Sequence, residues 1–368
     1  AFGGRTDLTT ITLPKSLSAF ATDAFYGCTN LSALHVDVSN PTYWSVDGVV
    51  FNKAGTLLVR YPVGRGGHYT IPEGVSSLDW DSFSSCSKLT SVTIPDGVHW
   101  MGGFAFRWCS ALTNVSWGNG LEVIETEAFS GCAGLAQLDI PDCVTNIASG
   151  AFYNCNGLTN VALGSGLTYL DPTTFEYCTN LSVITVAELN PEYSSLDGVL
   201  FNKDQTVLLL CPEGRTGNYT IPAGVITIAV FAFGLCAQLT SVELSRSVVA
   251  GEDYAFSGCL NLTNVELGIS FSSLGERAFG DCIKLTTIQV VAANPAFSST
   301  GGVLFDKGQT TLLLCPEGKA GDYAIPNGTA LIGSRAFYSC TNLTHVTFPD
   351  SVISLGSEAF RECTALTE

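Results

Sequence analysis

A five-residue motif, Ala-Phe-x-x-Cys, returns along most of the chain at a fixed spacing. Consecutive copies lie 23 residues apart, except at three places where the spacing is 58 residues, or 23 plus 35. A chain with this period grows by stacking one repeat, or coil, on the next, so 368 residues need not form a single compact core. The motif phenylalanines are Phe2, Phe25, Phe83, Phe106, Phe129, Phe152, Phe175, Phe233, Phe256, Phe279, Phe337 and Phe360.

A second motif, Leu-x-x-Val-x-Ile-Pro, follows the cysteine, as in residues 89–95. Its alternating apolar residues are typical of a short strand with one buried face, and Pro and Gly after it favour a turn. One such strand cannot bury its face alone, so we predict a repeat solenoid of fourteen stacked parallel strands forming a curved sheet on the concave side. We expect the Ala-Phe-x-x-Cys segments to form short 3₁₀ or single-turn helical stretches on the convex side. The inward strand residues should include Ile71, Ile94, Ile140, Ile221 and Ile325.

Three long coils, at about residues 37–71, 187–221 and 291–325, lack the Ala-Phe-x-x-Cys motif. Each contains two apolar runs around a four-residue turn with a lysine, as in GVLFNKDQTVLLL, which is typical of a β-hairpin. We therefore predict three antiparallel pairs that lie beside the stacked strands: residues 48–52 with 56–61, 198–202 with 206–211, and 302–306 with 310–315.

The composition excludes several classes of partner. The net charge is −17, with 16 Lys and Arg against 33 Asp and Glu, so phosphate backbones and acidic membrane surfaces are disfavoured and no nucleic-acid partner is expected. No apolar run approaches the roughly 20 residues of a membrane span, so none is expected in this chain. Because the chain begins and ends inside a repeat without a polar cap, we expect residues 1–368 to be a single solenoid taken from a longer array.

Eleven of the fourteen cysteines occupy the same motif position, and Cys211 and Cys315 share a second position where the first long coil has Tyr61. Cysteine is often buried as a small apolar residue, which predicts a column of reduced, packed thiols. The alternative is a ladder of disulfides, although parallel side chains on stacked coils are poorly oriented for it. On the packing hypothesis, Cys132→Ser should destabilise the protein more than Cys132→Ala, because a hydroxyl would be buried without an assured partner.

The strand with Leu-x-x-Val-x-Ile-Pro, followed by Ala-Phe-x-x-Cys at a 23-residue period, resembles the BspA-like leucine-rich repeats, similar to the repeats of Treponema proteins. The resemblance covers essentially the whole chain and includes the long coils. It implies a leucine-rich repeat solenoid in a cell-surface or secreted protein that binds host or bacterial surface proteins. It supplies no catalytic residue.

Two groups of residues are candidates for binding a partner. The outward strand positions form a polar, mildly acidic face that either makes polar contacts with a partner or is merely solvated; its candidates are Asn114, Gln137, Asp139, Asn160, Glu243, Asn264 and Glu266. Tryptophans Trp80, Trp100 and Trp108 replace smaller residues on adjacent coils, where they either pack convex segments together or form an exposed contact patch. Trp117 replaces an aliphatic strand residue and is expected in the core.

We find no sequence motif for a catalytic nucleophile, a zinc or calcium site or a phosphate-binding loop, so catalytic, metal-binding and cofactor-binding residues are not expected and the protein is not expected to be an enzyme. The leading hypothesis is an extracellular or cell-surface protein that mediates protein binding or adhesion. The alternative is self-association, in which the array assembles into fibres or a surface layer.

Overall fold

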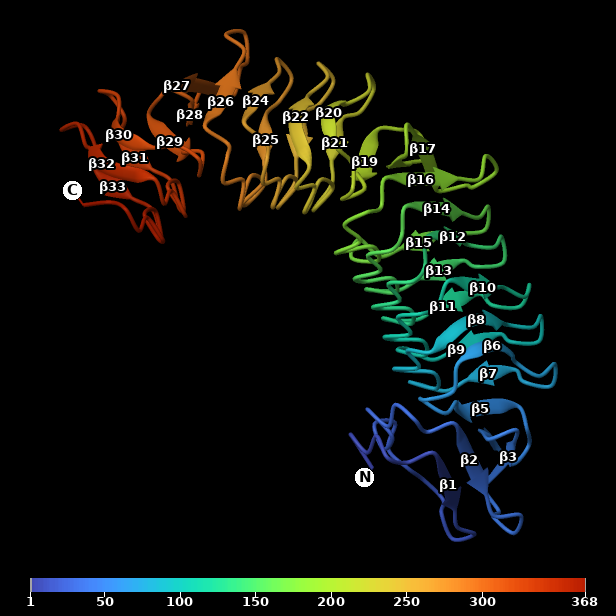
Figure 1. Cartoon of the computed structure of the whole chain (residues 1–368). Helices are drawn as coiled ribbons and strands as arrows, with labels where there is room; N and C mark the ends of the chain where they lie inside the picture. The colour runs from blue at the N-terminus through green and yellow to red at the C-terminus, as the bar shows by residue number, and fades with distance from the viewer. Residues whose placement is uncertain (1, 368) are drawn as a thin grey trace. The chain divides into compact units, whose positions relative to one another are not determined.

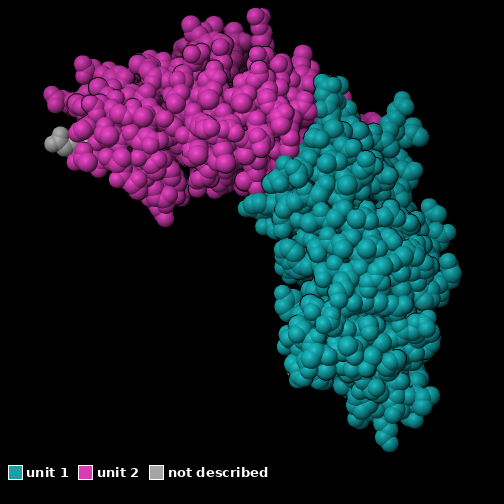
Figure 2. All heavy atoms as spheres, viewed as in Figure 1, with its two compact units in different colours: residues 1–198 teal, residues 199–368 magenta. Residues whose placement is uncertain are grey.

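The computed structural model describes residues 2–367, which form two compact units (Figure 2). The first unit ends at Gly198 and the second begins at Val199. Both units are β-solenoids in which each coil contributes short strands joined by turns (Figure 1). That all 368 residues form one uninterrupted solenoid stays a prediction.

The main strands confirm the predicted ladder. Where consecutive coils pair, they pair in parallel with residues 23 positions apart opposite each other, as Val161 is opposite Ile184. Ile71, Ile94, Ile140, Ile221 and Ile325 are all buried, as expected for inward positions. The fourteen main strands are β1 (Thr10–Leu13), β2 (Ala33–Val36), β6 (Gly67–Thr70), β8 (Leu89–Thr93), β10 (Asn114–Ser116), β12 (Gln137–Asp139), β14 (Asn160–Leu163), β16 (Val183–Val186), β20 (Gly217–Thr220), β22 (Leu239–Glu243), β24 (Asn264–Leu267), β26 (Thr287–Val290), β30 (Gly321–Ala324) and β32 (Leu343–Thr347).

A second line of parallel strands, each two residues long, follows the turn after the main strand. Two residues carry too little periodic pattern to be recognised in a sequence. These strands are β7 (Ser77–Leu78), β9 (Trp100–Met101), β11 (Val123–Ile124), β13 (Asn146–Ile147), β15 (Tyr169–Leu170), β21 (Thr227–Ile228), β23 (Ala250–Gly251), β25 (Ser273–Leu274), β31 (Leu331–Ile332) and β33 (Ser354–Leu355).

The Ala-Phe-x-x-Cys segments, which we call turn segments, correct one expectation: no 3₁₀ or α-helix occurs within residues 2–367. In the turn segment 125–132, every second N–H donates to the carbonyl three residues earlier, with N···O distances of 3.1 Å. The N–H groups between them donate instead to carbonyl oxygens of the next coil at 2.8–3.0 Å; these are the groups of Glu127, Phe129 and Gly131. A 3₁₀ helix needs consecutive local bonds, and here half of the donors are used between coils.

We call this succession of bonded turn segments the turn stack. Its geometry places some residues in the left-handed region, such as Glu127 at φ 49° and Gly131 at φ 74°. Inside it, the motif phenylalanines form a column of parallel rings, with Phe106 and Phe129 centroids 5.0 Å apart. Tyr61 takes the phenylalanine position in the first long coil and stacks on Phe83 at 4.8 Å.

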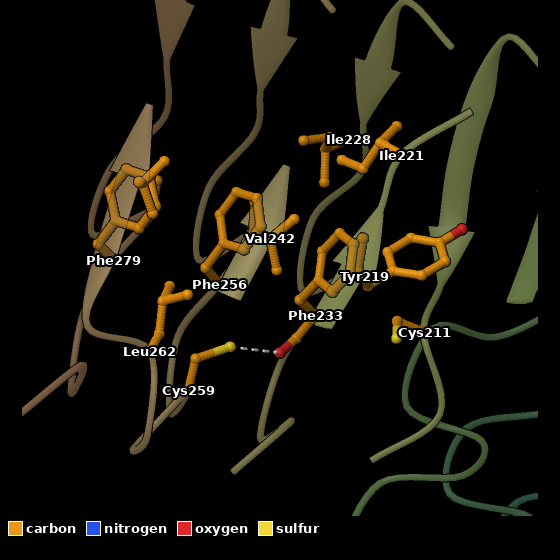
Figure 3. Packing of buried hydrophobic residues seen from close by; sticks show 14 of the residues in the cluster. Cys211, Tyr219, Ile221, Ile228, Phe233, Val242, Phe256, Cys259, Leu262 and Phe279 are labelled. Carbon is orange, nitrogen blue, oxygen red and sulfur yellow. Dashed lines mark hydrogen bonds between the residues drawn. The ribbon is translucent and has the colours of Figure 1, made fainter. Parts of the chain in front are cut away.

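The motif cysteines are reduced and lie next to this column. All fourteen cysteines of the chain are thiols, and twelve of them are buried. In eight coils the thiol donates to the carbonyl oxygen of the motif phenylalanine 26 residues earlier, with Sγ···O distances of 2.9–3.2 Å. Figure 3 shows this contact for Cys259 and Phe233. Burial raises the pKa of Cys132, which keeps its thiol protonated as a donor. The packing hypothesis is therefore confirmed. In addition, the carbonyl oxygen of a motif phenylalanine lies beside the cysteine and accepts a hydrogen bond from the thiol.

The long coils contain the predicted antiparallel pairs, for example Phe51 opposite Leu58, Phe201 opposite Leu208 and Phe305 opposite Leu312. In the first and third long coils a further antiparallel strand precedes the pair, so each forms a three-stranded meander. In the first meander, the turn between the added strand and the pair is Asp47-Gly48, with φ of 49° and 76°. The second long coil spans the end of one unit and the start of the next. Its strands and those of the other two are β3 (Tyr43–Val46), β4 (Val49–Asn52), β5 (Leu57–Arg60), β17 (Tyr193–Leu196), β18 (Val199–Asn202), β19 (Val207–Leu210), β27 (Phe297–Thr300), β28 (Val303–Asp306) and β29 (Thr311–Leu314).

A buried asparagine begins each long coil, at positions 40, 190 and 294. The amide nitrogen of Asn294 donates to the carbonyl oxygens of Gly268 and Phe271, both at 2.7 Å. Its amide oxygen accepts the N–H groups of Ala296 and Phe297 at 2.8 and 2.7 Å. The side chain therefore joins the preceding coil to the start of the meander with four hydrogen bonds.

We expect Cys132→Ala to lower the free energy of unfolding by about 1–2 kcal/mol, through lost burial and a small cavity. Because the Phe106 carbonyl oxygen lies 3.1 Å from Sγ, Cys132→Ser should cost no more than this, which reverses the expectation from sequence. Urea denaturation measures both. Thiol titration with an aromatic disulfide reagent should give at most two reactive groups in the native protein and nearly fourteen in guanidinium; four or fewer in guanidinium would contradict the reduced state.

Asn294→Ala should destabilise the protein by about 3 kcal/mol, because it leaves two carbonyls and two N–H groups in buried or half-buried positions without their partner. The matched control is Asn264→Ala, an exposed asparagine on β24, which should change stability by less than about 0.5 kcal/mol. Equal urea midpoints for the two variants would show that Asn294 does not hold the meander.

Candidate functional site

The strand face is the set of outward side chains on the main strands, and all seven polar candidates predicted from sequence are exposed on it. Asn114, Gln137, Asp139 and Asn160 lie on β10, β12 and β14 of the first unit. The second unit has three candidates, on β22 and β24: Glu243, Asn264 and Glu266. The candidates thus form two groups, one in each unit.

The strand face of the first unit is opened where the ladder is interrupted. Strands β10 and β12 belong to separate sheets, although the turn stack beside them is continuous. Trp117 follows β10 in a position held in most other coils by Ile, Leu or Val, and its ring meets Phe129 edge-on at 5.4 Å. We infer that the larger ring keeps the strands apart. The expectation that Trp117 lies in the core is met only in part, because it is half-buried.

A cleft of about 310 Å³ occupies this interruption, and the exposed Asn114, Gln137 and Asp139 line it. A second hollow of about 310 Å³ lies over β12, β14 and β16 and shares Gln137 and Asp139 with the first. Amide and carboxylate groups provide hydrogen-bond donors and acceptors here. The half-buried Trp117 lines the first cleft, and no aromatic side chain lines the second, so few aromatic groups are available to anchor a partner.

The strand face of the second unit is acidic. Glu243 and Glu266 are opposite each other on adjacent strands, and Gln289 follows in the same row. The Thr220 hydroxyl donates to the Glu243 carboxylate at 3.0 Å. Adjacent like charges repel one another slightly, so this row is better suited to solvent or to a basic partner.

The predicted tryptophans separate into two places. Trp80 and Trp108 lie on neighbouring turn segments and are 43% and 42% exposed. Trp100 lies on β9, is half-buried, and shares no ring contact with them among residues 2–367. The sequence hypothesis of an exposed aromatic contact patch therefore applies to Trp80 and Trp108 but not to Trp100.

Two residues missed in the sequence complete a continuous cluster, which we call the aromatic patch: Trp80, Phe104, Arg107 and Trp108. The rings of Trp80 and Phe104 are 5.9 Å apart. The Arg107 guanidinium lies 5.1 Å from the Phe104 ring centroid and 5.8 Å from that of Trp108. Arg107 is also 3.3 Å from the Glu127 carboxylate, so its position is fixed from both sides.

Glycines on the following coils make room for both indoles. A Cβ atom on Gly103 would lie 2.4 Å from Trp80, and one on Gly131 would lie 2.2 Å from Trp108. Each ring therefore lies directly against the backbone of the next turn segment. The sequence left two alternatives for these tryptophans, packing between segments or an exposed contact patch. For Trp80 and Trp108 both apply, because one side of each ring packs against the next turn segment while the rest remains exposed.

The backbone under the patch is strained. Phe104 and Trp108 have φ of 59° and 60°, a region that bulky residues seldom adopt. The hydrogen bonds of the turn stack hold both residues there, for example from Trp108 N–H to the Ser130 carbonyl at 2.7 Å. Nearby, burial raises the pKa of Asp79, whose carboxylate accepts the Trp80 N–H at 2.9 Å. The equivalent positions of other turn segments have the same backbone geometry, for example Asp81 at φ 55° and Tyr254 at φ 57°, so this strain belongs to the repeat and does not mark the aromatic patch.

Within residues 2–367, no group of three or more potential metal ligands occurs. No helix in the same range is long and apolar enough to cross a membrane. The surfaces described above that could contact another molecule are the aromatic patch and the two polar hollows.

Comparison with known proteins agrees with the fold. The model of the BspA type leucine rich repeat region matches in six copies, over residues 1–48, 67–182, 214–306 and 319–368. No curated protein sequence gave a match.

Among solved structures, the chain is similar to a leucine-rich repeat protein from Eubacterium ventriosum, with 20% identity and a TM-score of 0.63 over 89% of this chain and 94% of that one. A leucine rich cell surface protein from Faecalibacterium prausnitzii is 25% identical, with a TM-score of 0.52 over 89% and 85% of the two chains. A leucine-rich repeat protein from Bacteroides ovatus is 24% identical, with a TM-score of 0.54 over 89% and 79%. The family matches span more than half of the sequence, so the chain belongs to the BspA type leucine-rich repeat family.

Proposed function

We propose that this protein is a non-enzymatic, extracellular or cell-surface leucine-rich repeat protein that binds a protein partner through the aromatic patch. The observation that carries the proposal is the pair of exposed indoles, Trp80 and Trp108, which are joined by Phe104 and Arg107 and fixed on the turn stack. Trp, Tyr and Arg supply most of the binding energy in protein interfaces, whereas scattered small polar residues supply little.

Rigidity favours the aromatic patch over the strand face as the main contact. An immobilised ring loses little conformational entropy when a partner binds, and both indoles already lie against backbone glycines. The Arg107 guanidinium can serve an acidic or aromatic group of the partner. The two polar hollows of the strand face, which Asp139 lines, would then add polar contacts with the same partner or form a separate contact site.

Similarity supports the location. The chain belongs to the BspA type family, and the Faecalibacterium prausnitzii protein, which is similar over most of both chains, is described as a cell surface protein. Location at a surface or outside the cell is compatible with binding a host or bacterial surface protein. The alternative, assembly of copies into fibres or a surface layer, would use the same exposed patch between identical chains.

The test is adhesion of the purified protein to bacterial and to epithelial cell surfaces, with and without prior trypsin treatment of the cells. Trp80→Ala and Trp108→Ala should each weaken adhesion about thirty-fold, equivalent to about 2 kcal/mol. The control variants, Asp139→Ala and Asn160→Ala on the strand face, should change it less than threefold. Circular dichroism melting of each variant checks that the fold is retained.

Loss of adhesion after trypsin treatment is expected, because the partner is a protein. Equal weakening by the strand-face variants, or trypsin-resistant adhesion, would contradict the proposal. Sedimentation velocity over a concentration series tests the alternative: growth into larger species that Trp80→Ala abolishes would assign the patch to self-association instead.

A further inference from the structure

The second unit contains a cavity of about 550 Å³ where the third long coil interrupts the turn stack. This coil has no Ala-Phe-x-x-Cys segment, so the turn segment 275–282 is followed by the turn segment 333–340 only after an insertion. The insertion reaches the stack through Cys315, whose N–H donates to the Ala336 carbonyl at 2.7 Å. Apolar side chains form much of the cavity wall: Leu274, Phe279, Phe297, Leu313 and Leu314.

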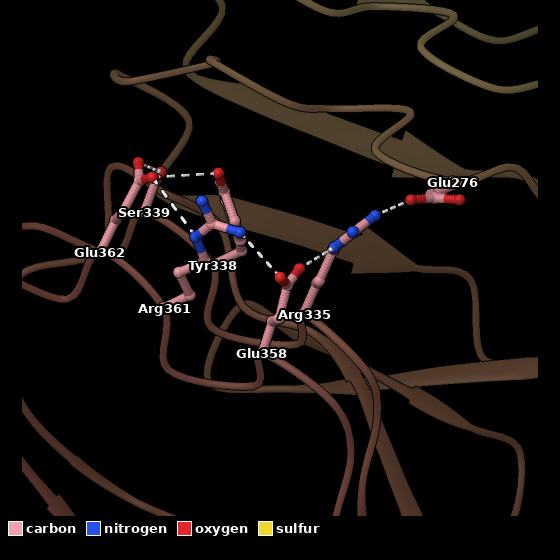
Figure 4. A network of polar contacts seen from close by, with 7 residues as sticks. All are labelled: Glu276, Arg335, Tyr338, Ser339, Glu358, Arg361 and Glu362. Atoms are coloured by element: carbon pink, nitrogen blue, oxygen red, sulfur yellow. Dashed lines mark hydrogen bonds and ion pairs between the residues drawn. The ribbon is translucent and has the colours of Figure 1, made fainter.

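Two arginines line the cavity, and acidic side chains other than Glu317 pair with both. Arg335 pairs with Glu276 and, at 2.7 Å, with Glu358 (Figure 4). Arg277 pairs with Asp281 at 3.2 Å. The positive charges at this cavity are therefore already matched by carboxylates.

Glu317 is the lining carboxylate that these pairs leave out. It is only 8% exposed and forms no ion pair among residues 2–367. One of its oxygens, Oε1, accepts the N–H of Asp281 at 3.0 Å. In an uninterrupted stack, the N–H at this position donates to a backbone carbonyl of the next turn segment, as Gly131 N–H donates to the Tyr153 carbonyl. Here the Glu317 carboxylate takes the place of that carbonyl. A structural role therefore explains one oxygen of Glu317. The charge of Arg277 acts on this carboxylate, but no cation among residues 2–367 lies within ion-pair distance of it.

We propose that this cavity is a binding site for an alkylammonium group, the chemistry shared by a lysine side chain and a free aliphatic amine. The ammonium would bind the Glu317 carboxylate, and the alkyl stem would lie against Leu313, Leu314 and Phe279. Charge favours this occupant: both lining arginines already have carboxylate partners, whereas Glu317 has no ion pair among the described residues, so an ammonium group meets a free acceptor and an anion does not.

Binding should depend on pH. The pKa of Glu317 is raised to about 7, mainly by burial. The hydrogen bond from the Asp281 N–H opposes the shift, as does the charge of Arg277, while the charges of Asp281 and Glu362 add to it. Glu276, Arg335 and Arg277 also line the cavity, where Arg335 is paired with Glu276. An ammonium group prefers the ionised carboxylate, whose fraction rises from about one tenth at pH 6 to about nine tenths at pH 8. The apparent affinity should therefore rise about tenfold over this range.

The experiment titrates the full chain with n-butylamine, followed by carbon-13 NMR of the glutamate carboxyl groups and by calorimetry. Butan-1-ol and butyrate, of the same length, test apolar and anionic occupants. We expect saturable binding of n-butylamine, stronger at pH 8 than at pH 6, with the alcohol and the acid at least tenfold weaker. Amine binding should lower the pKa of Glu317, which is observed directly. Equal affinity for the three probes, or stronger binding of butyrate, would overturn the proposal.

Glu317→Gln should weaken amine binding at least tenfold and abolish its pH dependence, while Glu266→Gln on the strand face is the matched control and should leave binding unchanged. Unchanged binding in Glu317→Gln would refute the assignment. If that variant unfolds, the Glu317 carboxyl shift in the unmodified chain decides alone, and a shift that n-butylamine does not move counts against the site.

A further arm compares n-butylamine with Nα-acetyl-lysine methylamide. Tighter binding of the lysine derivative indicates a lysine side chain of a partner, and tighter binding of the free amine indicates a small-molecule ligand. The site lies in the second unit and the aromatic patch in the first, so Glu317→Gln and Trp80→Ala test the two proposals separately.

Discussion

Hydrogen bonds between successive turn segments hold each coil of this solenoid in register with the next. A parallel strand ladder alone would tolerate coils of different lengths, since only the strands need to match. The turn stack adds a second set of bonds, such as Phe129 N–H to the Ala151 carbonyl, that must also meet wherever one turn segment directly follows another. A 23-residue period satisfies both sets, which explains why the sequence repeats so strictly. The long coils keep this contact: Tyr61 and Cys315 donate their N–H groups to the Ala-position carbonyls of the following coils.

The recurrent cysteine follows from the same constraint. The motif phenylalanine carbonyl already accepts the N–H of its own turn, and the thiol of the next coil reaches its second lone pair; at Phe106, the N–H of Cys109 and the thiol of Cys132 both do so at 3.1 Å. The slot therefore requires a side chain short enough for a closely packed turn, apolar enough to be buried and able to donate. Cysteine meets all three requirements.

Much of the fold could be predicted from sequence, because period and alternation are local signals. The fourteen strands and the paired runs around Phe51, Phe201 and Phe305 were all found in this way. Three features depend on contacts between coils and escaped prediction: the two-residue strands, the alternating bonds of the turn segments, and the acceptor beside Cys132. At the candidate sites, the sequence singled out Trp80, Trp100 and Trp108 together, but Trp100 lies on β9 and shares no ring contact with the other two among residues 2–367. The Glu317 cavity joins residues up to 83 positions apart, from Leu274 to Ser357, and no local pattern marks it.

Amide hydrogen exchange of the first unit, measured residue by residue, tests the turn stack most directly. Connecting turns on a protein surface normally exchange fast, because their N–H groups contact water. The account predicts that the amides of Glu127, Phe129 and Gly131 exchange as slowly as those of the neighbouring strand β14, since each donates to the next coil. Exchange of these three amides at the rate of exposed loops, with β14 still protected, would show that the turn segments are not bonded to one another and would contradict the account.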